Sequence, residues 1–137
     1  MIVLDEELQG LGLEAAVARW YRGAVFIVKH LRPGTIIKDD AIPQLLSQAK
    51  HPTFVTINHS DFWRRAPAHE SYCIICLKLT TEEIEQVSPW LRRLFSLPEF
   101  RTKLARMGRV VLAGKRGIQY YSTTELVIHI RGWLNPG

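Results

Sequence analysis

The chain has 137 residues, 47% of them hydrophobic and 23% charged, and a formal net charge of +5. This length suits a single core and the composition is globular, which excludes a disordered, fibrous or repeat protein, so we expect one domain over residues 1–137. No apolar run approaches the roughly 18 residues of a membrane span, and the N-terminal MIVLDEELQ carries acids where a secretory signal carries Lys or Arg, so we expect a cytoplasmic protein with no membrane partner.

The chain begins with a predicted strand, helix and second strand. Residues 2–4 (IVL) form a short apolar run that is ended by acids. Residues 7–23 place apolar side chains at helical spacing until Gly23 ends the helix. Residues 24–28 (AVFIV) are rich in β-branched and aromatic side chains, which favours a strand, and Arg-Pro-Gly at 32–34 indicates a turn after it.

A second helix and a third strand follow. The segment DDAIPQLLSQAK (39–50) begins with Asp39 or Asp40 as N-cap and carries Pro43 in its first turn, where a missing N–H costs little. Residues 53–57 (TFVTI) predict the strand. Alternating helices and near-continuous apolar strands are typical of a parallel sheet covered by crossover helices, which bring the carboxyl ends of the strands to one edge. We therefore expect an α/β fold with a central, mostly parallel sheet.

The second half predicts further strands around a broken helical segment. Helices in short pieces are expected over residues 80–108, where prolines follow Ser88 and Leu97. Glycines bound a turn at 114–117, which predicts a hairpin. Strands are expected at residues 72–79, 109–113, 118–121 and 125–130. The domain should therefore end in a helical segment followed by a β-hairpin.

The only cysteines, Cys73 and Cys76, lie in the strand predicted at 72–79. A spacing of three along a strand points the two side chains to opposite faces of the sheet. We therefore expect two buried, reduced thiols rather than a disulfide or a shared metal.

The positive charge is concentrated in the second half of the chain. Residues 71–137 hold ten Lys and Arg against five Asp and Glu, whereas residues 1–70 hold eight of each. Most of the excess falls between Arg92 and Arg116, where eight Lys and Arg, Arg106 among them, face only Glu99. A polyanion is the natural partner of such a surface. The candidate nucleic-acid contacts in this half are Arg92, Arg93, Lys115 and Arg116. A solvated helix face that keeps the protein soluble is the alternative.

All four aspartates of the chain lie where the predicted strands meet one edge of the sheet. Asp5 follows the first strand, Asp39 and Asp40 open the helix after the second, and Asp61 follows the third. Open α/β sheets bind their ligands at this edge. Glu6 and Asn58 would join the aspartates there. Each acid taken alone can instead cap a helix or make a turn with its own backbone.

A cluster of carboxylates indicates a metal ion. Three or more carboxylates at one edge repel one another unless a cation neutralises them. Hard oxygen ligands favour Mg²⁺ or Mn²⁺, which can activate water and orient a phosphodiester. The residues alone thus predict metal-dependent phosphodiester or phosphoryl chemistry.

The order of LDEEL, KDDAI and FVTINHSDF resembles the PIN-like domains, small metal-dependent ribonucleases that often serve as toxins of toxin–antitoxin pairs. In the branch it most resembles, the first strand ends in Leu-Asp-Glu, a helix opens with Asp-x-x-Ile, and the third strand runs into Thr-x-Asp-x-Asp-Phe. The resemblance covers roughly residues 1 to 65. It implies a PIN-like fold that cleaves RNA with Mg²⁺ or Mn²⁺, with an antitoxin protein as partner.

Carried over residue by residue, the resemblance assigns Asp5, Asp39 and Asp61 as catalytic metal ligands. The chain departs from the pattern at Asn58, which stands where the family has the first acid of its third motif, and the spacing to Asp61 is one residue longer. Asn58 can still offer a carbonyl oxygen to a hard cation but adds no negative charge, so we expect weakened metal binding and activity. The residues that would compensate are Glu6, Asp40 and His59, the last of which can instead be a surface turn residue.

The three residues that directly follow Asp61 and Phe62 are further candidates for binding RNA. Arg64 and Arg65 can bind phosphate, and the indole of Trp63 can stack on an unpaired base. The alternative is that Trp63 anchors the loop to the core and the arginines are solvated.

Two other functions remain open alongside the ribonuclease. The first is a PIN-like module that binds nucleic acid or protein without cutting it, because of Asn58. The second is a phospho-acceptor receiver domain, which also gathers acids around Mg²⁺ but needs its acceptor aspartate directly at the end of the third strand, where this chain has Asn58. RNA and an antitoxin are the expected partners, and a homodimer is left open.

Overall fold

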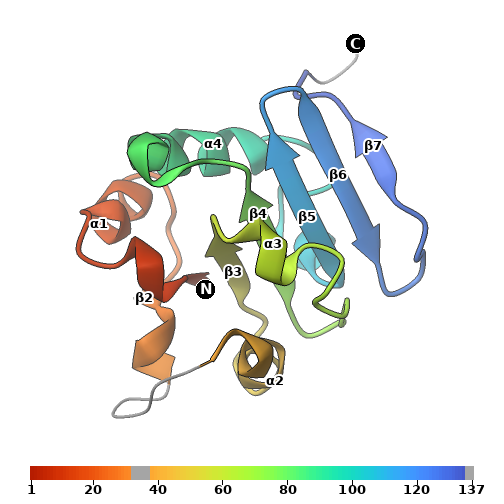
Figure 1. The fold of residues 1–137 in the computed structure, drawn as a ribbon, viewed down its shortest axis with the longest axis horizontal. Coiled ribbons are helices and arrows are strands. Elements are labelled where there is room, and N and C mark those ends of the chain that lie inside the picture. The colour runs from red at the N-terminus through yellow and green to blue at the C-terminus, as the bar shows by residue number, and fades with distance from the viewer. Residues whose placement is uncertain (32–37, 135–137) are drawn as a thin grey trace.

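The computed structural model describes residues 1–31 and 38–134, so the turn predicted at Arg32-Pro33-Gly34 lies outside the described residues. Within them, the strands form one sheet in the order β2-β1-β3-β4-β5-β6-β7 (Figure 1). The strands are β1 (Ile2–Leu4), β2 (Val25–Ile27), β3 (Thr53–Thr56), β4 (Cys73–Leu77), β5 (Arg109–Gly114), β6 (Gly117–Ser122) and β7 (His129–Arg131). Neighbouring strands from β2 to β5 are parallel, and β6 and β7 are added antiparallel. The expected α/β fold with a mostly parallel sheet and a terminal hairpin is confirmed.

The helices of the described residues are short, and none is long and apolar enough to cross a membrane. They are η1 (Glu6–Leu8), α1 (Leu13–Ala18), η2 (Val28–Leu31), η3 (Asp39–Ala41), α2 (Ile42–Ser47), α3 (His59–Phe62), η4 (Thr81–Gln86), α4 (Val87–Leu94) and α5 (Lys103–Arg106), where η marks a 3-10 helix. The helix expected over 7–23 is confirmed only in its central part, as α1. Gly10 and Gly12 adopt φ values of 77° and 75°, which interrupt a right-handed helix, so the regular α-helix begins only after them.

The helix after β2 begins differently from the prediction. Lys38 is the N-cap of η3 and Ala41 is the N-cap of α2. The expectation that Asp39 or Asp40 caps this helix is therefore wrong. Because neither carboxylate is used as the cap, both are left for other partners.

The core lies on both faces of the sheet, because successive residues of each parallel strand alternate between two apolar clusters. Helices α1 and α4 lie next to each other and cover one face (Figure 1), and α2 and α3 cover the other. Cys73 belongs to the first cluster and Cys76 to the second, and both are buried and free. The prediction of two unbonded thiols on opposite faces is confirmed.

The last strand is shorter than expected and lies at the edge of the sheet. The prediction placed it at 125–130, but only His129–Arg131 pairs with β6. Leu126, Val127 and Ile130 are exposed, because no layer of the described residues covers this end of the sheet. The apolar run at 125–130 therefore did not predict which residues pair with β6.

Candidate functional site

The candidate site lies at the carboxyl ends of β1 and β3, which are neighbours in the sheet. The register pairs Leu4 with Val55, so Asp5 and Thr56 are the next residues along each strand. The backbone N–H of Asp5 donates to the carbonyl of Val55 over 2.9 Å, which extends the ladder by one bond. The parallel pairing thus places the first predicted acid directly beside the end of the third strand.

Asp5 is a buried carboxylate with two hydrogen-bond donors. Asp5 is only 6% exposed. One oxygen accepts the backbone N–H of Glu6 at 2.8 Å, and the other accepts the hydroxyl of Thr56 at 2.7 Å. Burial raises the pKa of Asp5, while the bonds from Thr56 and Glu6 oppose that rise. Asp5 therefore caps η1, as one interpretation of the sequence expected, and also faces the site.

Thr56 connects the two halves of the site. Its hydroxyl donates to Asp5 and accepts the backbone N–H of Asn58 at 2.9 Å. The same oxygen lies 3.3 Å from a carboxylate oxygen of Glu7. A hydroxyl has one proton to donate, and the shorter distance gives it to Asp5. The polar end of β3 thereby fixes both the buried acid and the start of the loop that carries Asn58.

Asn58 holds two carboxylates through one amide group. Its Nδ2 donates to Asp61 at 2.7 Å and to Asp39 at 3.1 Å, which uses both hydrogens of the NH₂ group. Its Oδ1 accepts the hydroxyl of Ser60 at 3.2 Å. Asn58 therefore bridges the loop after β3 and the 3-10 helix after β2, and brings Asp39 and Asp61 together as the sequence predicted.

The two bridged carboxyl groups titrate differently. Burial, followed by the hydrogen bond with Asp61 and by the charge of Asp5, raises the pKa of Asp39 to about 6. The hydrogen bonds from Asn58 and from Asp39 lower the pKa of Asp61. Asp39 is thus the weaker acid of the pair, although both carboxyl groups accept from the same amide.

Glu7 joins this cluster, whereas the sequence pointed to Glu6. Burial raises the pKa of Glu7 and the charge of Asp39 adds to that rise, so its carboxylate lies close to the other acids. Both glutamates are exposed, but the side chain of Glu6 makes no hydrogen bond within residues 1–31 and 38–134, whereas that of Glu7 lies 3.3 Å from the hydroxyl of Thr56. Both glutamates follow the strand, and only the direction of the 3-10 turn decides which faces the site. The sequence carries no signal for that direction.

An open depression borders the acids on the side of α2 and α3. Its volume is about 470 Å³, and its lining includes Asp39, Asp40, Asp61 and Arg65. The charge of Arg65 contributes to the lowered pKa of Asp61. Of the predicted residues, Asp40 and Arg65 therefore lie beside the acidic pair.

The other predicted nucleic-acid contacts are spread over the molecule. Trp63 is half-buried and its ring packs against Tyr121 at a centroid distance of 5.3 Å, so it anchors the loop. Arg64 is exposed, with a left-handed φ of 63°. Arg92 and Arg93 are in the last turn of α4, and the guanidinium of Arg93 lies over the ring of Trp133 at 5.1 Å.

The basic stretch from Arg92 to Arg116 is not one surface. Arg106 is only 3% exposed, and its guanidinium donates to the hydroxyl of Thr53 and to backbone carbonyls. It also lies 4.0 Å from the centroid of the Phe95 ring. The expectation that this whole stretch faces a polyanion is wrong for Arg106, because that side chain serves the interior.

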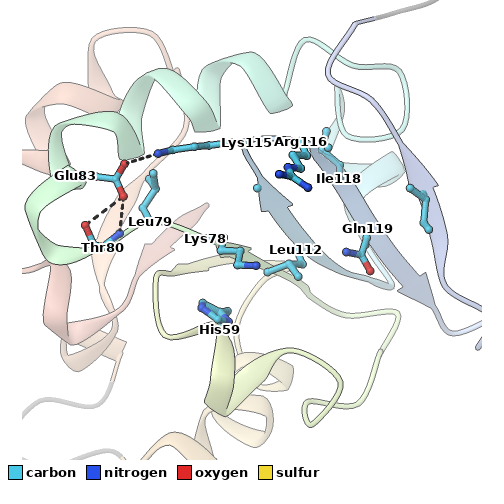
Figure 2. A pocket seen from close by; sticks show the side chains of 13 residues that line it. His59, Lys78, Leu79, Thr80, Glu83, Leu112, Lys115, Arg116, Ile118 and Gln119 are labelled. Atoms are coloured by element: carbon cyan, nitrogen blue, oxygen red, sulfur yellow. Dashed lines mark hydrogen bonds and ion pairs between the residues drawn. The ribbon is translucent and has the colours of Figure 1, made fainter.

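A second cleft lies at the same edge of the sheet, between α3 and the β5–β6 hairpin. Its volume is about 630 Å³, and Figure 2 shows Lys115 and Arg116 above His59 and Lys78. Lys115 pairs with Glu83 at 3.3 Å. His59 lines this cleft and is the residue after Asn58, so the cleft begins where the acid cluster ends. Trp133 lies between this hairpin and α4, because its indole N–H donates to the carbonyl of Gly114 at 2.6 Å while the guanidinium of Arg93 lies over its ring.

The oxygen donors around Asn58 fit a hard cation after one rotation. Within the described residues, no three His, Cys, Asp or Glu side chains form a metal-binding group. The amide of Asn58 stands between Asp39 and Asp61. A half-turn of that amide would put Oδ1 between the carboxylates, which gives three oxygen ligands of the kind Mg²⁺ and Mn²⁺ prefer. The hydroxyl of Ser60 can then accept from Nδ2 instead of donating to Oδ1.

Comparison with known proteins gave no significant match to a protein-family model, a curated protein or a solved structure.

Proposed function

We propose that the protein is a PIN-like ribonuclease that hydrolyses RNA phosphodiester bonds with Mg²⁺ or Mn²⁺. The observation that carries the proposal is the meeting of Asp39 and Asp61 around Asn58, beside the buried Asp5. Burial raises the pKa of Asp39 to about 6, and the charges of the neighbouring acids add to a rise that a bound cation would oppose. The motifs of residues 1–65 support the same family and the same three acids.

The chain's own residues would hold the metal and the phosphate. Asp39, Asp61 and the carbonyl oxygen of Asn58 would be the ligands, with Asp5 beside them. A metal held there supplies an activated water and neutralises charge on the phosphate. Arg65 borders the same depression and would bind a non-bridging phosphate oxygen through its guanidinium. In the hydrolysis, the water oxygen bonds to phosphorus, the bond from phosphorus to one ribose oxygen breaks, and that oxygen leaves with a proton.

Cleavage of a labelled single-stranded RNA with Mn²⁺, Mg²⁺ or EDTA tests the proposal. We expect products only with a metal, and a rate at least about tenfold lower in Asp61→Asn. Asp40→Asn is the matched control, because Asp40 lines the same depression but lacks the hydrogen bonds that join Asp39 and Asp61 to Asn58. An unchanged rate in Asp61→Asn, or cleavage that persists in EDTA, would contradict the proposal.

A second candidate is a PIN-like module that binds nucleic acid or protein without cutting it. The specific observation in its favour is that a neutral amide already satisfies Asp39 and Asp61, so the cluster is compatible with folding without a metal. RNA binding without cleavage in both the wild type and Asn58→Asp would favour this module over the ribonuclease. Cleavage that appears only in Asn58→Asp would identify a site silenced by one substitution.

A further inference from the structure

The cleft between α3 and the β5–β6 hairpin has the charge and the position of a nucleotide-binding site. Lys78 follows β4 and Lys115 follows β5, and these strands are neighbours in the sheet. The charge of the side chains at this edge of the sheet therefore changes along its length, from carboxylates at β1 and β3 to cations at β4 and β5. His59 lies at the junction, next to Asn58 in the chain and in the lining of the cleft (Figure 2).

The cations of the cleft are available to a ligand. Lys78 and Arg116 are exposed, and neither forms an ion pair within the described part of the chain. Lys115 is paired with Glu83, but its side chain is 74% exposed, and such a pair contributes little that a phosphate could not replace. Two or three cations around a hollow of about 630 Å³ match a ligand with one or two phosphate groups.

The cleft also offers contacts to a base. Ile130 projects from β7 with an exposed fraction of 78% and lines the cleft, so its side chain can pack against the flat face of a base. The amide of Gln119 lies in the same lining and can donate to or accept from the edge of a base. In a duplex the base faces are stacked and the edges paired, so these contacts require a single strand.

We propose that this cleft binds a nucleotide of single-stranded RNA that flanks the cleaved bond, with its phosphate on Lys78 and Arg116. The proposal rests on the ribonuclease function for the identity of the ligand. It assigns the RNA a path along the edge of the sheet, from the acids at β1 and β3 past His59 to the β5–β6 hairpin. The subsite thus lies on the β4 and β5 side of the acids, in a cleft whose lining does not include Arg65.

Fluorescence anisotropy with a labelled single-stranded RNA in EDTA tests the cleft separately from catalysis. We expect the Kd to rise at least about tenfold in the double variant Lys78→Ala, Arg116→Ala. The slope of log K against log salt should fall by about 0.7 for each phosphate contact that is lost. The matched control is the double variant Arg19→Ala, Arg22→Ala, which removes the same charge from exposed residues around the end of α1, outside the lining of both clefts, and should leave both quantities unchanged.

The outcomes separate this inference from the proposed function. Metal-dependent cleavage with wild-type affinity in the Lys78, Arg116 double variant overturns the subsite and leaves the ribonuclease standing. If the wild type cleaves no RNA, but the Lys78, Arg116 double variant loses RNA affinity and the control does not, the ribonuclease is overturned and the cleft is supported as an RNA site. Equal affinity for duplex and single strand overturns the single-stranded assignment. Failure of the folded wild type to bind RNA in EDTA overturns the inference.

Discussion

The amide of Asn58 donates to the carboxylate of Asp61 over 2.7 Å, and its second hydrogen goes to Asp39. A neutral donor therefore occupies the place between two acids in which a cation would be expected. This relationship makes the metal-free protein a stable starting state, since the paired carboxylates are not left without a partner. It also makes Asn58 the residue whose substitution should separate stability from metal binding.

Replacing Asn58 with aspartate should destabilise the metal-free protein and strengthen metal binding. The variant exchanges two hydrogen bonds for a third negative charge, so we expect the free energy of unfolding in EDTA to fall by about 1–3 kcal/mol. Saturating Mn²⁺ should restore more stability to the variant than to the wild type, measured as the shift in Tm. Asn58→Ala loses the same hydrogen bonds without adding charge and should gain nothing from Mn²⁺. Equal Mn²⁺ shifts in Asn58→Asp and the wild type would contradict a role for this position in holding a cation.

Stability should depend on pH through Asp39. Its pKa is raised from 3.8 to about 6 in the folded protein, chiefly by burial, so the folded state holds this proton more tightly than the unfolded chain does. The contribution of Asp39 to stability is therefore full below pH 3.8 and is lost as the pH rises through about 6. The lowered pKa of Asp61 changes the free energy of unfolding only below pH 3.8, so it does not cancel this trend.

Urea denaturation at several pH values between 4 and 7 measures that trend. The difference in the free energy of unfolding between the wild type and Asp39→Asn should change across this window, with the wild type losing stability relative to the variant as the pH rises. Acids that do not interact with Asp39 contribute equally to both proteins and drop out of the difference. A difference that stays constant from pH 4 to 7 would rule out a raised pKa at Asp39.

Removing the hydroxyl of Thr56 should weaken the fold and the site together. Thr56→Val keeps the shape but leaves the buried carboxylate of Asp5 without its donor and the N–H of Asn58 without its acceptor. We expect a loss of about 1–3 kcal/mol in the free energy of unfolding. Thr56→Ser retains the hydroxyl and should recover most of that stability. If valine and serine variants are equally stable, the two hydrogen bonds of Thr56 contribute little.

The two neighbouring glutamates should differ in their effect on RNA cleavage. Glu7 lies among the acids, and removing its charge should lower the Mn²⁺ affinity and the cleavage rate of Glu7→Gln. The side chain of Glu6 makes no hydrogen bond within the described residues, so Glu6→Gln should behave as the wild type in both measurements. A larger effect in Glu6→Gln than in Glu7→Gln would contradict this prediction and would favour Glu6, the residue that the sequence indicated.

Some parts of this fold follow from sequence patterns alone, because the parallel strands are buried on both faces and are apolar throughout. The positions of β1 to β6 and the meeting of Asp39 with Asp61 could be predicted in that way. The interruption of the first helix depends on the positive φ of Gly10 and Gly12, which periodicity does not reveal. Glycine content alone does not fix a backbone conformation, because glycine adopts both signs of φ.

Side-chain direction accounts for most of what the sequence could not predict. The choice of Glu7 over Glu6 depends on a 3-10 turn, and the burial of Arg106 depends on packing between elements far apart in the chain. A count of charges treats Arg106 and Arg116 alike, although one is inside and the other outside. The cleft itself arises from β4, β5 and the hairpin together, so it has no local signature.

The hydrogen bond from the N–H of Asp5 to the carbonyl of Val55 joins residues that are distant in the chain. The neighbouring acids come from two further segments, so the cluster is assembled only when β1 has paired on both sides. Contacts of such large sequence separation form late, because the loops between them must close first. The amide of Asp5 should accordingly exchange its hydrogen with solvent only through global unfolding, which would make it a reporter of the whole molecule's stability from within the site.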